Sequence, residues 1–101
     1  MLGQLVTNSP TYTHTVILSN PATQNPFTIA SNGLIDAPVG HGIIGTAGFA
    51  WTIDNLGTVI TTAPTGFGIY LTAGGTVVNG HSGSSAGLIS AGRAGIALDA
   101  L

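Results

Sequence analysis

Two short glycine-containing motifs have the spacing of known cofactor-binding or catalytic motifs. Residues 40–45 have the spacing of the dinucleotide-binding motif GxGxxG, whose glycines let a backbone approach a pyrophosphate at a helix N-terminus. No helix-forming stretch follows, and Asp54 comes too early to reach a ribose. Residues 83–87 have the GxSxG spacing around Ser85, but no histidine follows, so the hydrolase order of serine, acid and histidine is not met. Neither motif predicts an enzyme.

The other groups that carry chemistry are few and scattered. His14, His41 and His81 lack the spacing of metal ligands. β-Helical enzymes that cleave acidic polysaccharides need clustered carboxylates with basic side chains, whereas this chain has three aspartates and one arginine. We therefore predict no catalytic residues, no bound metal and no cofactor. Six aromatic residues could instead form a sugar-binding strip, although packing is the more common use of such side chains: Tyr12, Phe27, Phe49, Trp51, Phe67 and Tyr70.

The charge content excludes some partners and favours others. Only 4% of the 101 residues are charged, against roughly 25% in ordinary soluble domains. A net charge of -2, with no lysine, offers nothing to attract nucleic acid or an anionic membrane surface. Weak charge also removes the repulsion that keeps copies apart, which favours self-association. The lack of cysteine excludes a disulfide scaffold.

An internal repeat of about 24 residues is the strongest signal in the chain. A first apolar segment starts at positions 27, 51 and 75, a second at 33, 57 and 87, and a third at 42, 68 and 95. The second segment of the last unit is delayed by six residues, which marks 80–85 as an insertion. β-Branched segments between Gly, Asn, Ser and Pro predict short strands, and the repeat favours a strand over a helix at 95–98.

Three short strands per unit predict an all-β fold, a right-handed parallel β-helix, with coils at 27–50, 51–74 and 75–101. The spacing predicts which residues stack in its core: Ile29, Ile53 and Val77; Ile35, Val59 and Ile89; and Ile44, Tyr70 and Ala97 or their immediate neighbours. It also places Phe27 and Trp51 one coil apart at the same position. Ser31, Asn55 and Asn79 share one offset and predict a hydrogen-bonded ladder at a corner, although Asn is also a common turn residue.

Two of these runs carry a family resemblance. The run from Ala50 to Ile60, with Trp-Thr-Ile-Asp-Asn followed by Gly-Thr-Val-Ile, and the run from Gly66 to Asn79 resemble the β-helical repeats of autotransporter passengers and haemagglutinin-like adhesins of Gram-negative bacteria. The likeness covers about residues 27–98. It implies a β-solenoid with an adhesive or structural role, secreted or held at the cell surface.

Residues 1–26 do not fit the repeat. Two Asn-Pro pairs, at positions 20 and 25, mark a loop. Before this loop one strand is predicted, made of Tyr12, Thr13, His14, Thr15, Val16, Ile17 and Leu18. This segment is a degenerate first coil, a cap, or a strand that pairs with another copy. Three or four coils expose backbone and core at both ends, and the sequence shows no charged cap at either end. Head-to-tail stacking would bury both ends and give a filament.

These observations favour a structural extracellular protein over an enzyme. We expect it to associate with itself end to end, as a homo-oligomer or filament, or to form part of an adhesin, with surface glycans as a further candidate partner. A carbohydrate-binding or carbohydrate-cleaving β-helix is the alternative. An ice-binding solenoid is the second alternative, because residues 11–15 carry a Thr-x-Thr-x-Thr pattern, which does not recur with the repeat.

Overall fold

The computed structural model describes residues 4–6, 12–46, 48–80 and 87–99. Their regular structure is almost entirely short β-strand, with one four-residue helix. The elements are β1 (Gln4–Val6), β2 (Val16–Leu18), α1 (Pro21–Gln24), β3 (Phe27–Ile29), β4 (Leu34–Ala37), β5 (Ile43–Gly45), β6 (Trp51–Asn55), β7 (Thr58–Thr61), β8 (Phe67–Leu71), β9 (Gly75–Asn79), β10 (Leu88–Ser90) and β11 (Ala94–Leu98).

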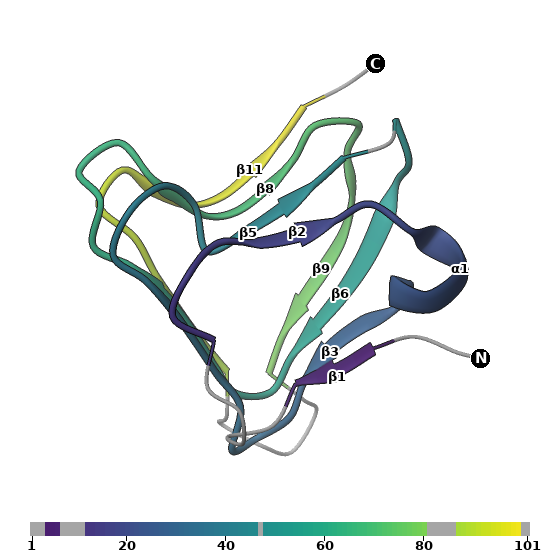
Figure 1. Ribbon diagram of the computed structural model, residues 1–101, viewed down its shortest axis with the longest axis horizontal. Coiled ribbons are helices and arrows are strands. Elements are labelled where there is room, and N and C mark those ends of the chain that lie inside the picture. Colours follow the sequence, from purple (N-terminus) through teal and green to yellow (C-terminus); the bar gives the residue numbers. More distant parts are fainter. Residues whose placement is uncertain (1–3, 7–11, 47, 81–86, 100–101) are drawn as a thin grey trace.

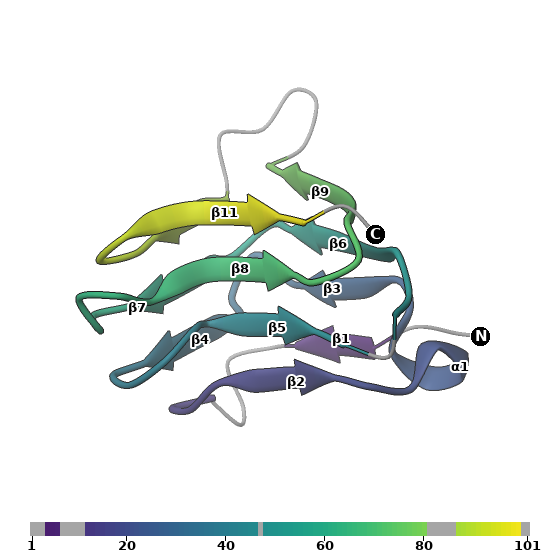
Figure 2. The ribbon, with the colours of Figure 1, turned by 90° about the horizontal axis from the view of Figure 1, so that it is seen from above.

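The strands form three parallel sheets that the chain visits in turn. Sheet A has the order β1-β3-β6-β9, sheet B the order β10-β7-β4, and sheet C the order β11-β8-β5-β2. Seen along the direction in which the strands stack, the sheets enclose a three-sided interior (Figure 1), and from the side successive passes lie in layers (Figure 2). The predicted all-β class is confirmed, and the arrangement is solenoid-like.

The strand register agrees with the repeat in sheets B and C. In sheet B the second segments of the three units pair with one another, and the last of them is displaced by the predicted six residues. In sheet C the third segments pair with one another. The rows are Ile35, Val59 and Ile89 in sheet B, and Ile44, Tyr70 and Ala97 in sheet C.

In sheet A the predicted alignment is wrong between β3 and β6. Phe27 lies opposite Ile53 and Ile29 lies opposite Asn55, so the predicted pairs of Ile29 with Ile53 and of Phe27 with Trp51 are not formed. The ladder begins only at Phe27, because Pro26 has no N–H to donate. The Asn25 side chain accepts the N–H of Thr52 instead, at 2.8 Å.

From β6 to β9 the 24-residue spacing holds. Ile53 lies opposite Val77, and Asn55 lies opposite Asn79. The departure from the 24-residue spacing in sheet A is therefore confined to the pairing of β3 with β6.

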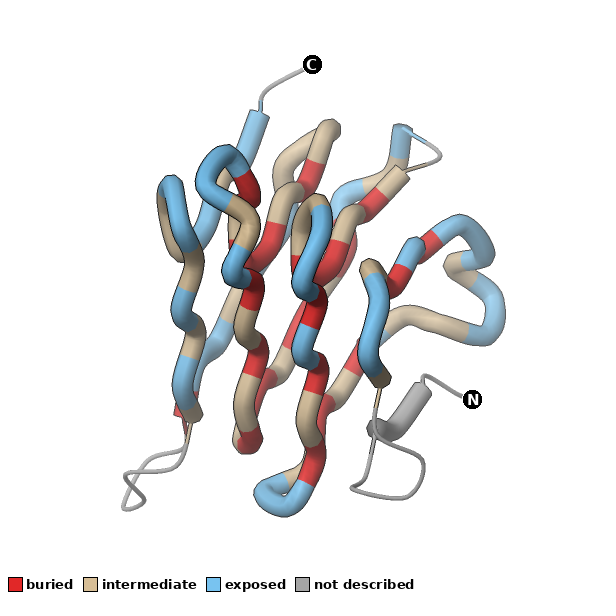
Figure 3. Tube along the Cα trace, turned by 60° about the vertical axis from the view of Figure 1, so that its left-hand side comes forward, coloured by how far each residue is buried: buried red, intermediate tan, exposed pale blue. Residues whose placement is uncertain are grey.

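Side chains alternate between the interior and the surface along most strands, as Figure 3 shows by colour. The buried hydrophobic residues form one core: Val16, Leu18, Phe27, Ile29, Ile35, Ala37, Ile43, Trp51, Ile53, Val59, Ile69 and Leu71. Of the predicted core residues, Ile29, Ile53, Ile35 and Val59 are fully buried, whereas Val77 and Ile89 are partly buried against this core. In sheet C the neighbours Ile43 and Ile69 face inward, and Ile44 and Tyr70 are half-buried on the outer side.

The segment from Tyr12 to Leu18 is not one strand, which corrects the prediction. Tyr12 pairs with Ile35 beside sheet B, and only Val16, Ile17 and Leu18 form a strand, β2, in sheet C. Thr13, His14 and Thr15 connect the two sheets, and the Thr15 hydroxyl donates to the His41 carbonyl at 2.6 Å. The segment thus passes from sheet B to sheet C, as the chain does again between β4 and β5 and between β7 and β8.

The predicted loop after Leu18 contains the single helical turn α1. The Asn20 side chain caps it by accepting the N–H of Ala22, and Pro21 occupies the first turn, where no N–H is needed. The Gln24 side chain returns to accept the N–H groups of Ser19 and Asn20, each at 2.9 Å. At the other end of the chain, β11 is a strand, as the repeat predicts.

Candidate functional site

The C-terminal end of the stack leaves inward-facing apolar side chains open. Ile96 and Leu98 lie opposite Ile69 and Leu71, which are fully buried, so all four face the interior. Ile96 is nevertheless 42% exposed and Leu98 is 49% exposed. Among the described strands, β9, β10 and β11 each have a neighbour on one side only. This end therefore combines open core with unpaired strand edges.

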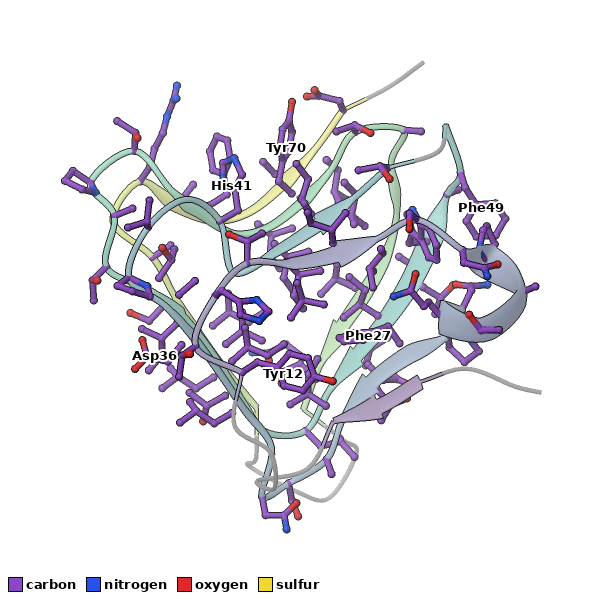
Figure 4. The ribbon with its side chains drawn as sticks, in the orientation of Figure 1. Tyr12, Phe27, Asp36, His41, Phe49 and Tyr70 are labelled. Carbon is purple, nitrogen blue, oxygen red and sulfur yellow. The ribbon has the colours of Figure 1, made fainter. Side chains whose placement is uncertain are left out.

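The N-terminal end differs. Val16 and Leu18 belong to the outermost strand of sheet C, yet they are 5% and 0% exposed. Tyr12 packs against the core at this end. Figure 4 shows its ring within the three-sided interior, on the side of Phe27. One end of the core is thus covered and the other is open.

A buried amide ladder lies near the open end. The Asn55 carboxamide is fully buried and donates to the Asn79 side-chain oxygen at 2.8 Å and to the Leu88 carbonyl at 3.1 Å. Its own oxygen accepts the N–H of Gly57 at 3.1 Å. Ser31, the predicted first member, lies exposed two positions beyond Ile29, the residue opposite Asn55. The ladder therefore joins two of the three predicted residues.

Three aromatic rings gather on the outer side of sheet C. The His41 ring stacks on that of Phe67, with 5.3 Å between centroids and 9° between planes. Tyr70 lies 5.3 Å from His41 and 5.2 Å from Phe67. The Phe67 N–H donates to His41 Nδ1 at 2.9 Å, which places the hydrogen of the neutral ring on Nε2.

Two opposite charges border this aromatic cluster of His41, Phe67 and Tyr70. The Arg93 guanidinium carbon lies 5.1 Å from the Phe67 ring centroid, and the Tyr70 hydroxyl donates to Asp99 Oδ2 at 2.7 Å. The hydrogen bond to Asp99 and the negative charge of that carboxylate raise the pKa of Tyr70, because both favour the neutral phenol. Half of the four charged residues in the sequence therefore lie at one site.

The predicted aromatic strip is not formed as a continuous row. Phe27 and Trp51 are fully buried, and the Trp51 Nε1–H donates to the Thr46 carbonyl at 2.8 Å. Phe49 packs edge-on against Trp51 at 5.0 Å. The surface cluster was not predicted, although the sequence holds one signal for it. His41 stands two residues before Ile43, and Phe67 stands two residues before Ile69, which pairs with Ile43. The two rings therefore occupy equivalent positions relative to neighbouring strands.

The described residues of the motifs considered for catalysis lie in different parts of the fold. Residues 40–45 include strand β5, and the next described element is the strand β6, not a helix. Asp36 lies on the exposed side of sheet B and Asp54 lies in sheet A. Ser85 and His81 fall outside the described residues. Within the part of the chain that is described, no three His, Cys, Asp or Glu residues lie close enough to hold a metal ion.

Searches against protein families, curated proteins and solved structures found no match. None of the described residues belongs to a helix with the length and hydropathy needed to span a membrane.

Proposed function

We propose that this chain is a structural protein, a right-handed parallel β-helix with coils of about 24 residues. It associates with further copies end to end, into a filament or as part of a surface adhesin. The right-handed sense follows the strong general preference of crossovers between parallel strands. The observation that carries the proposal is the exposure of Ile96 and Leu98 on the inward side of the last strand. A secreted or cell-surface location belongs to the same proposal.

Head-to-tail stacking supports this role because the same ladders can continue. Strand β11 is one edge of sheet C and β2 is the other, and β9 and β1 are the two edges of sheet A. A second copy could add its β2 to β11 and its β1 to β9 without changing strand direction. A translation of this kind never closes, so it yields a filament.

The expected free energy of association comes mostly from burial at the open end. Covering the exposed halves of Ile96 and Leu98 contributes about 1 kcal/mol each, taking roughly half of the value for a fully buried side chain. Each backbone hydrogen bond added along the strand edges contributes about 1 kcal/mol more. The net charge of -2 opposes association only weakly.

A concentration series followed by light scattering and electron microscopy tests the proposal. We expect mass to rise with concentration and elongated particles to appear, whereas a monomer at high concentration would refute the role. The double variant Ile96→Ser/Leu98→Ser should weaken association roughly 30-fold, because about 2 kcal/mol of burial is lost. Val39→Ser is the matched control, since Val39 is 78% exposed and lies in the loop between β4 and β5. Equal weakening by the control would show that association is not through the end.

A further inference from the structure

We infer that the aromatic cluster of sheet C, with Arg93 and Asp99 beside it, binds a neutral oligosaccharide. The site shares strand β11 with the open end but lies on the outer side of sheet C, whereas Ile96 and Leu98 face the interior. His41 precedes β5, Phe67 and Tyr70 belong to β8, and Arg93 and Asp99 flank β11. Figure 4 shows His41 and Tyr70 pointing outward from sheet C. The site therefore lies on the side of the stack, where it stays accessible when the ends are covered.

An apolar strip surrounds Tyr70 along the outer side of the sheet. Tyr70 lies between Ile44 and Ala97 in the parallel register, and Ile17 continues the row beyond Ile44. Ile17 is 58% exposed, and the other three are half-buried. A ring and aliphatic side chains in one row offer an apolar surface, which suits the C–H face of a pyranose ring better than a charged group.

The polar groups beside the strip select the ligand by their charge. Arg93 and Asp99 carry opposite charges, so the site has no net charge to attract an acidic polysaccharide or a basic peptide. The guanidinium offers five N–H donors, and Tyr70 occupies one of roughly four acceptor positions of a carboxylate. Donors and acceptors beside an apolar surface match sugar hydroxyls, which both donate and accept. The chemistry therefore points to a neutral, hydroxyl-rich ligand with an apolar face.

Calorimetric titration with cellohexaose, xylohexaose and mannohexaose, with an oligogalacturonate as the charged comparison, tests the site. At least one neutral hexasaccharide should bind more tightly than the oligogalacturonate. Tyr70→Ala should weaken that binding about tenfold, while Tyr70→Phe, which keeps the ring, should change it less than threefold. Arg93→Ala, at an exposed position, should weaken binding without affecting the fold.

Leu88→Ala is the matched control, because Leu88 is 52% exposed and belongs to sheet B. It should bind as the unaltered protein does, and circular dichroism should show the same fold for every variant. Failure of all three neutral sugars to bind would overturn the proposal. So would equal affinity of Tyr70→Ala and the unaltered protein, or preference for the oligogalacturonate. None of these results bears on association through the open end.

Discussion

Replacing Asn55 by alanine tests whether the buried amide ladder stabilises the contacts of β6 with β9 and β10. The change removes three hydrogen bonds, to Asn79, Leu88 and Gly57. At about 1 kcal/mol for each bond, the free energy of unfolding should fall by about 3 kcal/mol. The loss is not recovered through water, because Asn55 is fully buried. A loss of this size is a large fraction of the roughly 5–15 kcal/mol that stabilises a typical domain.

Urea unfolding followed by circular dichroism, at a concentration where association is not detected, measures this loss. The matched control is Asn79→Ala. Asn79 is exposed, and without it the Asn55 amide still donates to the Leu88 carbonyl. The control should lower the free energy of unfolding by only about 1 kcal/mol, because it removes the part-buried bond to Asn55 while water replaces its exposed bond to the Gly87 carbonyl. If the two variants unfold at the same urea concentration, the buried ladder does not carry the stability assigned to it.

Two further predictions concern the aromatic cluster and a tight corner. Asp99→Asn should lower the pKa of Tyr70 in a spectrophotometric titration, because it removes the charge that favours the neutral phenol. Since the pKa of Tyr70 is raised in the folded state, its contribution to stability is complete below about pH 10 and is lost as the pH rises through the raised value. Identical titration curves would contradict the contact. Gly57→Ala should destabilise the protein by about 2 kcal/mol, because a Cβ there would lie 2.3 and 2.5 Å from two backbone carbonyl oxygens. Gly95→Ala is the control, because the nearest atom to a Cβ there is 3.6 Å away, and its free energy of unfolding should stay within about 0.5 kcal/mol of that of the unaltered protein. Similar losses of stability in both variants would refute the packing argument.

The sequence predicted the core better than it predicted the register of sheet A. The β3–β6 register differs from the predicted one by two residues, yet Ile29 and Ile53 are both buried. Side chains alternate with a period of two, so a shift of two residues keeps the same side chains facing inward. The repeat therefore fixes which residues face the core, even where it misplaces their partners.

Other features escaped the sequence because they depend on contacts between coils. The break between Tyr12 and Val16 has no sequence signal, since both residues fit one apolar strand. The aromatic cluster depends on the sheet C register, which brings His41 beside Phe67. The pairing of Tyr70 with Asp99 joins a residue of β8 to the residue that follows β11, the adjacent strand of that sheet. Repeat spacing is sufficient to align strands, but it does not show which outward side chains of neighbouring strands come into contact.

The difference between the two ends bears on how copies would join. If two open ends met, the apolar side chains of β11 would face their own equivalents across a two-fold axis, and association would stop at a dimer. The strands of the two copies would then meet with a reversed direction, whereas every ladder among the described strands is parallel. Joining an open end to a covered end keeps that direction and leaves one open end for the next copy. Because Val16 and Leu18 are already buried in the single chain, growth of the proposed filament would be driven by the open end. Continued parallel pairing therefore favours a polar filament over a closed dimer.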